Sequence, residues 1–459
     1  MTTTTPTPAG QLRSTAGAHT GRRVPFGVAV AVSMLGGLAL TLLLVLVVFA
    51  GATEPVITGA GLVGLASGWA LLAALTTRFT GQPQRWAVVP AAVMAATGVG
   101  LLAVRPGDGL LTAAGWVWPA AALVLAVWMA RAARRGTTVR SRWLLYPAIG
   151  LVTVTSLAGA VETVTLARDD GRFAMTGQLY DVGGHRLHLD CAGAGSPTVV
   201  LENGLNEISA LWDAVTTQVS RTTRVCAYDR AGQGWSDDAD GPQDARQVAG
   251  DLHVLLARAG VHGPYVLAGH SSGGTLALTY AARYPAQVAG MVLLDSSSPR
   301  QYTDQPDFAG EYAIMHRLLP VMPALARVGG LHLIPASTAT ALSSDAAAQV
   351  RAFSTSPRGA NNLRDEHAQL LTVFRQAQAL TTFDPKPLAV VTARENADGT
   401  KGWAADQDKL AALSSNSTHW VAETTHVGLL DDAQGSVDSV RAITAVVTAV
   451  RTGIPLTMR

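Results

Sequence analysis

One serine of this chain stands in a pattern that supports nucleophilic chemistry. Residues 269–273 read Gly-His-Ser-Ser-Gly, directly after an apolar run and directly before a helical pattern at 272–283. A tight turn from strand to helix leaves no room for side chains at its flanking positions, so glycines fit there and Ser271 is pushed outward. A serine hydroxyl is a poor nucleophile at neutral pH unless a base lies beside it. The pattern therefore predicts a reactive serine that needs a base and an acid from elsewhere in the chain.

The elements that would position this serine follow from the apolar pattern after about residue 175. Strands are predicted at 178–182, 186–191, 198–202, 223–228, 265–268, 288–294, 388–392 and 420–422, and helices at 209–219, 243–259, 272–283 and 437–450. Gly183 and Gly184 separate the first two strands, which predicts a hairpin. The later alternation predicts a mostly parallel sheet covered by helices on both faces. The segment 298–380 interrupts it and is predicted to form a lid above the carboxyl ends of the strands, where open sheets bind ligands.

Three further motifs resemble the α/β-hydrolase superfamily, specifically its lipase- and esterase-like members. Residues 228–236 read Tyr-Asp-Arg-Ala-Gly-Gln-Gly-Trp-Ser, like the Asp-Arg-x-Gly-x-Gly-x-Ser loop after the fourth strand of that family. Residues 201–205, Leu-Glu-Asn-Gly-Leu, stand where the family has its His-Gly oxyanion loop, with Asn203 in place of His. Thr-His-Val at 425–427 follows the last strand, where the family places its histidine. The resemblance covers about 175–452 and implies an eight-stranded α/β-hydrolase fold with a helical lid.

The resemblance implies which residues share the chemistry with Ser271. His426 would be the general base, in preference to His270, which neighbours the serine, and His419, which opens a strand; these two are expected to pack or to face solvent. The backbone amides of Ser272 and Leu205 would hold the developing oxyanion. That assignment uses only backbone groups, so it tolerates the asparagine that replaces the family's histidine.

The acid that orients the histidine has three candidates. The resemblance predicts an aspartate shortly after the seventh strand, but Ala-Arg-Glu-Asn at 393–396 puts asparagine at that place. Glu395 and Asp398 lie close by and would substitute if the loop were shifted. Asp295 ends the sixth strand, where some hydrolases of this fold carry the acid. All three keep the order serine, acid, histidine, and Asp295 is favoured over Asp398 and Glu395.

The composition divides the chain into two unlike halves. Its 459 residues are 48% hydrophobic and only 14% charged, whereas about a quarter of the residues in a soluble domain are charged. Residues 1–161 hold eleven arginines, no lysine and two acids, a net charge of +9, while the other 23 basic and 30 acidic residues give −7. A wholly soluble or an intrinsically disordered protein is excluded. A nucleic-acid binder is disfavoured because the arginines lie between apolar runs and form no single patch.

The front half is predicted to be a membrane domain. Its five apolar stretches are residues 24–50, 55–77, 86–104, 110–130 and 143–167. About 20 helical residues cross a hydrocarbon core of about 30 Å, so each is long enough. The first far exceeds the apolar region of a signal peptide and is read as a retained anchor. It follows a tail, 1–23, predicted to be disordered and cytoplasmic. Glu162 is the only charged residue within the five stretches, and it is expected to reach the membrane interface.

Basic residues predict the orientation of this domain. Ten arginines lie on one set of connections: before the first stretch, between the second and third stretches, and between the fourth and fifth stretches. The opposite loops hold only Arg105. Basic loops face the cytoplasm, so the N-terminus is predicted to be cytoplasmic. Five spans then place everything after residue 167 outside the cytoplasm, as a multi-pass protein of the cell membrane.

The chain has two cysteines, Cys191 and Cys226, both in the back half. In the resembled fold their strands are antiparallel neighbours, so an extracytoplasmic domain would favour a disulfide between them. The alternative is two buried thiols.

These inferences together predict a membrane-anchored serine hydrolase, most simply an esterase or lipase-like enzyme that cleaves an apolar carboxylic ester through an acyl-enzyme. The expected partners are a small-molecule or lipid-like ester and the lipid bilayer, with no nucleic acid. No HExxH, CxxC or Walker pattern occurs, so no metal or nucleotide cofactor is expected. Two alternatives remain open. One is a transport or sensing protein whose hydrolase-fold domain only binds ligand, and the other is a thioesterase, peptidase or acyltransferase with the same triad.

Overall fold

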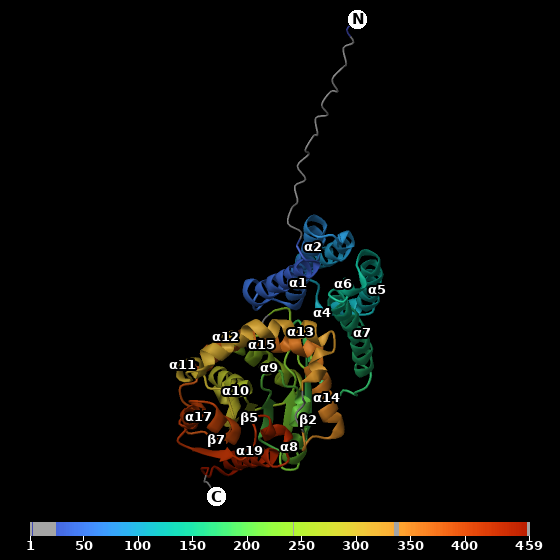
Figure 1. Cartoon of the computed structure of the whole chain (residues 1–459). Helices are drawn as coiled ribbons and strands as arrows, with labels where there is room; N and C mark the ends of the chain where they lie inside the picture. Colours follow the sequence, from blue (N-terminus) through green and yellow to red (C-terminus); the bar gives the residue numbers. More distant parts are fainter. Residues whose placement is uncertain (1, 3–23, 242, 335–338, 457–459) are drawn as a thin grey trace.

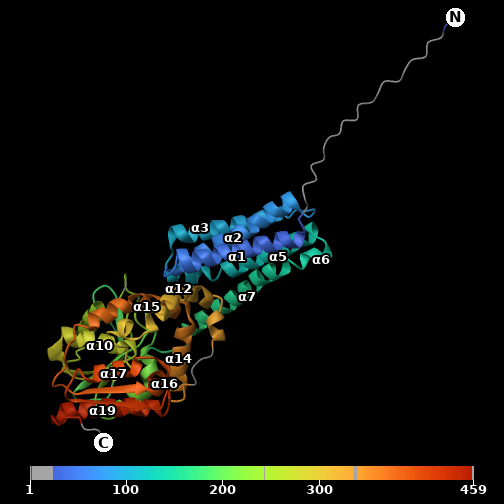
Figure 2. The same ribbon diagram turned by 60° about the vertical axis from the view of Figure 1, so that its left-hand side comes forward.

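The computed structural model describes residues 2, 24–241, 243–334 and 339–456, which form a helix bundle and a sheet-containing domain (Figure 1). The predicted tail, residues 1–23, lies almost entirely outside the described residues. The two parts contact each other through one end of the bundle and the helices inserted between strands β6 and β7 (Figures 1 and 2).

The bundle comprises long apolar helices with short connections. Its elements are α1 (Phe26–Leu43), η1 (Leu44–Val48), α2 (Glu54–Phe79), η2 (Arg85–Ala87), α3 (Val88–Val104), α4 (Asp108–Ala114), α5 (Trp118–Gly136), α6 (Val139–Arg142) and α7 (Tyr146–Asp169). Among the described residues, four helices are long and apolar enough to cross a membrane, or up to five if α4 and α5, bent by 48°, form one span. Pro119 lies in the first turn of α5, where proline cannot continue the preceding helix because it lacks an N–H group. The predicted fourth stretch is therefore a broken helix.

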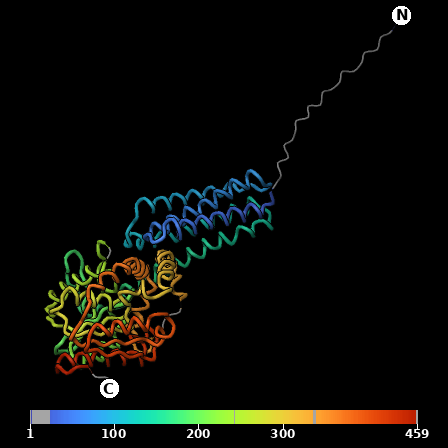
Figure 3. The backbone as a smooth tube through the Cα atoms, turned by 90° about the vertical axis from the view of Figure 1, so that its left-hand side faces the viewer, coloured from blue at the N-terminus to red at the C-terminus, as the bar shows by residue number. Residues whose placement is uncertain are grey.

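The bundle has two distinct ends. At one end the Val24 amide donates to the Phe79 carbonyl and the Gln84 side chain donates to the carbonyl of Gly136, which brings the start of α1 and the end of α5 together. The other end carries the α1–α2 loop, the α3–α4 loop and the C-terminus of α7, and it faces the sheet domain (Figures 2 and 3). The helices approach closely at Gly37 and Gly68, where an added Cβ would clash with the facing backbone, as is common in membrane helix packing.

The sheet has eight strands in the order β1-β2-β4-β3-β5-β6-β7-β8. The strands are β1 (Gln178–Asp181), β2 (Arg186–Ala192), β3 (Thr198–Glu202), β4 (Val225–Tyr228), β5 (Tyr265–His270), β6 (Val288–Leu294), β7 (Leu388–Ala393) and β8 (Ser417–Ala422). β2 is antiparallel to both of its neighbours, and all other pairs are parallel. The α/β-hydrolase fold with a mostly parallel eight-stranded sheet is thus confirmed.

Helices cover both faces of this sheet, and each face has its own core. On one face α9 (Ala245–Arg258) and α10 (Ser272–Arg283) bury their apolar sides against the strands. On the other face η3 (Ser209–Trp212), α8 (Asp213–Val219) and α19 (Gly435–Thr452) do the same. Burying one large apolar side chain contributes about 1.5–3 kcal/mol, so these two layers hold the strand ends, and with them the site, in place. The remaining short elements are η4 (Pro285–Gln287), α16 (Arg394–Gly399), α17 (Trp403–Ala411) and α18 (Gly428–Asp431).

The segment between β6 and β7 is largely helical. It contains α11 (Gln301–Asp304), α12 (Phe308–Leu318), η5 (Leu319–Val321), α13 (Met322–Ala326), η6 (Gly330–Leu333), α14 (Ser344–Thr355) and α15 (Pro357–Ala377). Helices α12, α13 and α15 lie between the sheet and the bundle (Figures 1 and 2), and the tube in Figure 3 shows the orange part of this segment beside the bundle helices. We call this segment the lid.

Candidate active site

Ser271 occupies a sharp turn between β5 and α10. Its backbone has φ 55° and ψ −126°, a conformation that an L-residue adopts only when its surroundings hold it there. The Ser271 amide donates to the carbonyl of Leu294, and its own carbonyl accepts from the amide of Ser297. A Cβ on Gly269 would lie 2.6 Å from the Gly273 backbone, so the turn requires a glycine there. The neighbouring backbone therefore holds the serine in its strained turn.

His426 follows β8, and its ring contacts Asp295 at the end of β6. The Nδ1 atom of His426 lies 2.5 Å from Oδ2 of Asp295, which is fully buried. Three donors hold the Asp295 carboxylate: the Trp403 indole at 2.7 Å, the Ala393 amide at 3.1 Å and the Asn396 side chain at 2.6 Å. A carboxylate at Nδ1 selects the tautomer in which Nε2 is free to accept a proton. Sequence reasoning did not find the supporting roles of Trp403 and Asn396.

The other two candidate acids do not contact the ring of His426. Asp398 makes an exposed ion pair with Arg394 at 3.7 Å. Glu395 accepts a hydrogen bond from the backbone amide of His426 at 2.7 Å. It therefore holds the backbone at His426 and does not bond to the imidazole ring. Of the three candidates, Asp295 is the one whose carboxylate meets the imidazole.

A second histidine lies beside the first. The ring centres of His270 and His426 are 4.5 Å apart. His270 is buried, with Nδ1 2.6 Å from Glu207 and Nε2 2.9 Å from the carbonyl oxygen of His426. Burial opposes the charged ring, but the Glu207 carboxylate outweighs it and raises the pKa of His270. The pKa of Glu207 is lowered, because His270 and the Gly204 amide outweigh its burial. His419, by contrast, contacts a threonine on β7 and an aspartate on α17.

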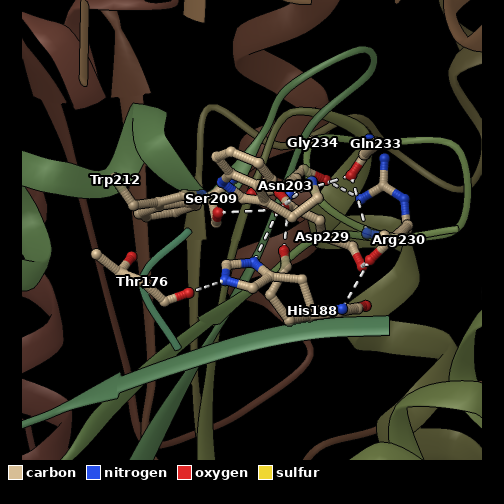
Figure 4. A network of polar contacts seen from close by, with 12 residues as sticks. Thr176, His188, Asn203, Ser209, Trp212, Asp229, Arg230, Gln233 and Gly234 are labelled. Carbon is tan, nitrogen blue, oxygen red and sulfur yellow. Dashed lines mark hydrogen bonds and ion pairs between the residues drawn. The ribbon is translucent and has the colours of Figure 1, made fainter. Parts of the chain in front are cut away.

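The asparagine at the predicted oxyanion loop is fully bonded (Figure 4). Asn203 donates to the carbonyl of Tyr228 at 2.9 Å and to Gln233 at 3.1 Å, and it accepts from the Trp212 indole at 2.9 Å. The Arg230 guanidinium donates to the Asn203 carbonyl at 2.6 Å. A buried amide is stable only when such partners are present. Asn203 therefore joins the oxyanion loop to the loop after β4.

The loop after β4 is itself fixed at Asp229, as Figure 4 shows. Asp229 lies 2.9 Å from His188 Nδ1 and accepts from the Ser209 amide at 2.6 Å. Burial opposes protonation of His188, but its hydrogen bond with Asp229 outweighs that effect and raises the pKa of the ring. The resulting buried pair anchors the turn that presents Arg230.

The lid also reaches the oxyanion loop. Glu366 on α15 forms an ion pair with Arg230 at 2.6 Å and accepts a hydrogen bond from the Asn206 amide at 2.7 Å. Arg230 in turn donates to the Gly204 carbonyl at 2.8 Å. One lid carboxylate thus holds both sides of the loop that carries Leu205.

The predicted oxyanion donors are available for a ligand. The N–H groups of Leu205 and Ser272 have no hydrogen-bond partner among the described residues, whereas those of Gly204 and Asn206 are taken by carboxylates. Ser272 is the first residue of α10, and the first N–H groups of a helix lack intrahelical partners. Within that same part of the chain, no group of three or more His, Cys, Asp and Glu side chains is arranged to hold a metal ion.

Cys191 and Cys226 face each other across the antiparallel strands β2 and β4. They are partners in the strand register, and a disulfide joins them. The two cysteines are 35 positions apart in the chain, and the segment between them includes β3 and the predicted oxyanion loop. The bond therefore ties β2 to β4 around that segment.

Comparisons with known proteins agree with this geometry. A family model described as alpha/beta hydrolase fold matches residues 197–318. An uncharacterized protein of Schizosaccharomyces pombe is 33% identical over 178 residues, which cover 32% of this chain and 33% of that protein. A protein of Hormonema carpetanum described as a probable transporter is 34% identical over 136 residues, which cover 28% of this chain and 20% of that protein. The 2-(acetamidomethylene)succinate hydrolase of Mesorhizobium japonicum is 30% identical over 115 residues, which cover 25% of this chain and 41% of that protein.

The chain spans only a third or less of the first two of these curated relatives. The family match nevertheless covers the strands and the elbow that carry Ser271, and the sheet has the order described above. The sheet domain therefore has the α/β-hydrolase fold, and residues 197–318 are similar to the family of that description. The chain carries in addition a bundle of helices long and apolar enough to span a membrane.

Proposed function

We propose that the chain is a membrane-anchored serine hydrolase that cleaves a carboxylic ester through an acyl-enzyme. The observation that carries the proposal is the 2.5 Å contact between His426 and the buried Asp295. The ring of His426 also lies 4.5 Å from that of His270, the residue before Ser271. A carboxylate at Nδ1 of a histidine orients the ring so that Nε2 can take the proton of a serine nucleophile. The hydrolase relative from Mesorhizobium japonicum supports a hydrolytic reaction as well.

The residues divide the reaction between them. Ser271 Oγ attacks the ester carbonyl carbon while Nε2 of His426 takes the hydroxyl proton, and Asp295 stabilises the imidazolium that forms. The amides of Leu205 and Ser272 donate to the carbonyl oxygen as it gains negative charge. The tetrahedral intermediate then expels the alcohol, which takes the proton from His426. A water molecule repeats the sequence and releases the acid from Ser271.

The test is a single substitution in the purified full-length protein. Ser271→Ala should lower kcat for p-nitrophenyl butyrate by about 10⁴-fold or more and abolish labelling by a fluorophosphonate probe. Ser354→Ala changes an exposed serine on α14 and should keep both activities. Hydrolysis that survives Ser271→Ala would reject the proposal.

We place the hydrolase domain on the extracytoplasmic side of the cell membrane. Of the nine arginines in residues 24–169, seven lie in or near the α2–α3 and α5–α7 connections, at the bundle end away from the sheet domain, as expected for cytoplasmic loops. The Cys191–Cys226 disulfide supports an oxidising compartment, because disulfides are rare in the cytosol. Labelling of Ser271 in intact cells by a membrane-impermeant fluorophosphonate would agree with this side, whereas labelling only after permeabilisation would contradict it.

A transport or sensing protein is the second candidate, since one relative is described as a probable transporter. In that case the hydrolase domain would bind a ligand without cleaving it. The same probe separates the two candidates, because a binding domain without a reactive serine stays unlabelled.

A further inference from the structure

The cavity in front of the oxyanion loop has walls from both parts of the chain. Its volume is about 650 Å³, and it reaches Leu205 and Ser272, whose amides are the proposed oxyanion donors. The sheet domain contributes the α15 face and the loop after β4. The bundle contributes the start of α2, the α3–α4 loop and α4, with Glu54, Arg105 and Leu111 among the lining residues. The bundle end that faces the sheet domain therefore lines the cavity that reaches the two proposed oxyanion donors.

Ion pairs fix the bundle against the lid at this cavity. Arg327, which follows α13, contacts both carboxylate oxygens of Glu54 and lies 2.6 Å from Asp108. Asn361 on α15 donates to Glu54 at 3.1 Å. The Arg327 and Glu54 side chains are only 13% and 3% exposed, and such pairs are costly to break once buried. The lid is thus clamped to the bundle and the cavity has a fixed wall.

A second contact lies farther along the same face. His332 of the lid is 3.0 Å from Glu162 near the end of α7. Ile314, Met315 and Leu318 on α12 are exposed, and α12 lies beside the outer end of the first helix (Figure 2). Exposed apolar side chains at this level suit contact with the lipid interface. The lid therefore lies where the bilayer surface would be.

The cavity wall is amphipathic. Leu276, Leu370 and Val373 line it on the sheet-domain side, together with Leu111 from the bundle. The charged side chains around it are largely paired with one another, as Arg230 is with Glu366. A ligand that fills such a space has an apolar chain and a compact polar group near Leu205.

We propose that the bundle is one wall of the substrate site and that the substrate is an amphiphilic ester taken directly from the bilayer. Its ester group lies at the oxyanion amides and its acyl chain passes Leu111 toward the membrane. This inference rests on the proposed serine hydrolase function. It explains a bundle of several helices, because a single anchor would hold the enzyme to the membrane without building a wall.

The experiment compares two neighbouring leucines of α4 in the full-length protein reconstituted in phosphatidylcholine vesicles. Leu111→Trp fills the cavity wall, whereas Leu110→Trp adds the same ring at a side chain that is 67% exposed and does not line the cavity. The substrates are 4-methylumbelliferyl oleate within the vesicles and 4-methylumbelliferyl acetate in solution. Leu111→Trp should lower the ratio of oleate to acetate hydrolysis by about tenfold or more, and Leu110→Trp should keep the wild-type ratio.

A second pair of variants tests the clamp. Arg327→Ala should also lower the oleate-to-acetate ratio, whereas Arg317→Ala, an exposed arginine on α12, should keep it. If the wild type hydrolyses both esters and all four variants share its ratio, the inference is overturned while the serine hydrolase function stands. If the wild type hydrolyses neither ester, the proposed function itself fails, and the inference falls with it.

Discussion

Glu207 and His270 form a buried ion pair, with 2.6 Å between Glu207 Oε1 and His270 Nδ1. His270 is the residue directly before Ser271, the proposed nucleophile. The other carboxylate oxygen of Glu207 accepts from the Gly204 amide, and Nε2 of His270 donates to the His426 carbonyl. Since a carbonyl can only accept, Nε2 carries a proton. One pair of side chains thus connects the oxyanion loop, the elbow and the segment of the proposed base.

The first prediction concerns this pair. Glu207→Gln removes the charge that raises the pKa of His270. It also weakens the hydrogen bond that the Gly204 amide donates to this side chain. We expect kcat to fall about 10- to 100-fold with KM little changed, because small displacements of reacting groups cost rate more than binding. The matched control is Glu423→Gln, which removes an exposed carboxylate that pairs with Arg394. A Glu207→Gln protein with wild-type kcat would show that the pair has no part in positioning.

The second prediction identifies the acid. Asp295→Asn keeps the shape of the side chain but removes its charge, so the imidazolium loses its counter-ion and kcat should fall by about 10⁴-fold. Asp398→Asn changes only a surface pair and should keep nearly all activity. Both are measured as p-nitrophenyl butyrate hydrolysis at pH 8. Equal losses in the two variants would reject Asp295 as the acid.

The third prediction exchanges the acid between two strand ends. Asn396 donates to Asp295 and lies 3.1 Å from Nδ1 of His426, so a carboxylate at 396 would also reach the ring. The double variant Asp295→Asn/Asn396→Asp should regain at least about tenfold of the activity lost in Asp295→Asn alone. Asn396→Asp alone sets two carboxylates side by side, which repel each other. The activity of this single variant should therefore not exceed that of the wild type. No gain in the double variant would mean that the 396 position cannot orient His426.

Local patterns predicted the parts of the site that depend on local geometry. The glycines around Ser271 and the alternating strands are signals within a few residues of each other, and the structure has the elbow and the mostly parallel sheet where these patterns lie. The acid could not be settled in this way. Asp295, Asn396 and His426 follow three different strands, and nothing in the chain alone states how far those loops reach toward one another.

The contacts between bundle and lid had no local signal at all. Arg327 and Glu54 are 273 residues apart in the chain, and neither stands in a motif. Glu162 was predicted to reach the interface, but its partner His332 belongs to the lid and is 170 residues away. The bend between α4 and α5 lies beside one proline in a run that is otherwise apolar. Such features depend on tertiary packing, which composition and periodicity do not specify.

The last prediction follows from the pKa of Glu202. This residue ends β3 and is fully buried, and burial raises its pKa to about 7 although the Tyr228 hydroxyl donates to it at 2.7 Å. A glutamate in the unfolded chain titrates near its ordinary pKa of about 4.3. The folded protein therefore binds one more proton between these two values. This stabilisation is complete below the unfolded pKa and is lost as the pH rises through about 7. Its loss lowers the free energy of unfolding by about 4 kcal/mol.

Glu202→Gln removes that titration while keeping an acceptor for Tyr228. We expect the free energy of unfolding of the wild type to fall more steeply between pH 5 and pH 8 than that of the variant, with the variant the more stable protein at pH 8. The measurement is urea unfolding of the full-length protein in detergent, followed by tryptophan fluorescence at each pH. Glu311→Gln, on the exposed face of α12, should follow the wild-type curve. If the Glu202→Gln and wild-type curves run parallel over this range, the carboxyl does not hold its proton in the folded protein, because a proton bound only in the folded state must appear as a difference in slope.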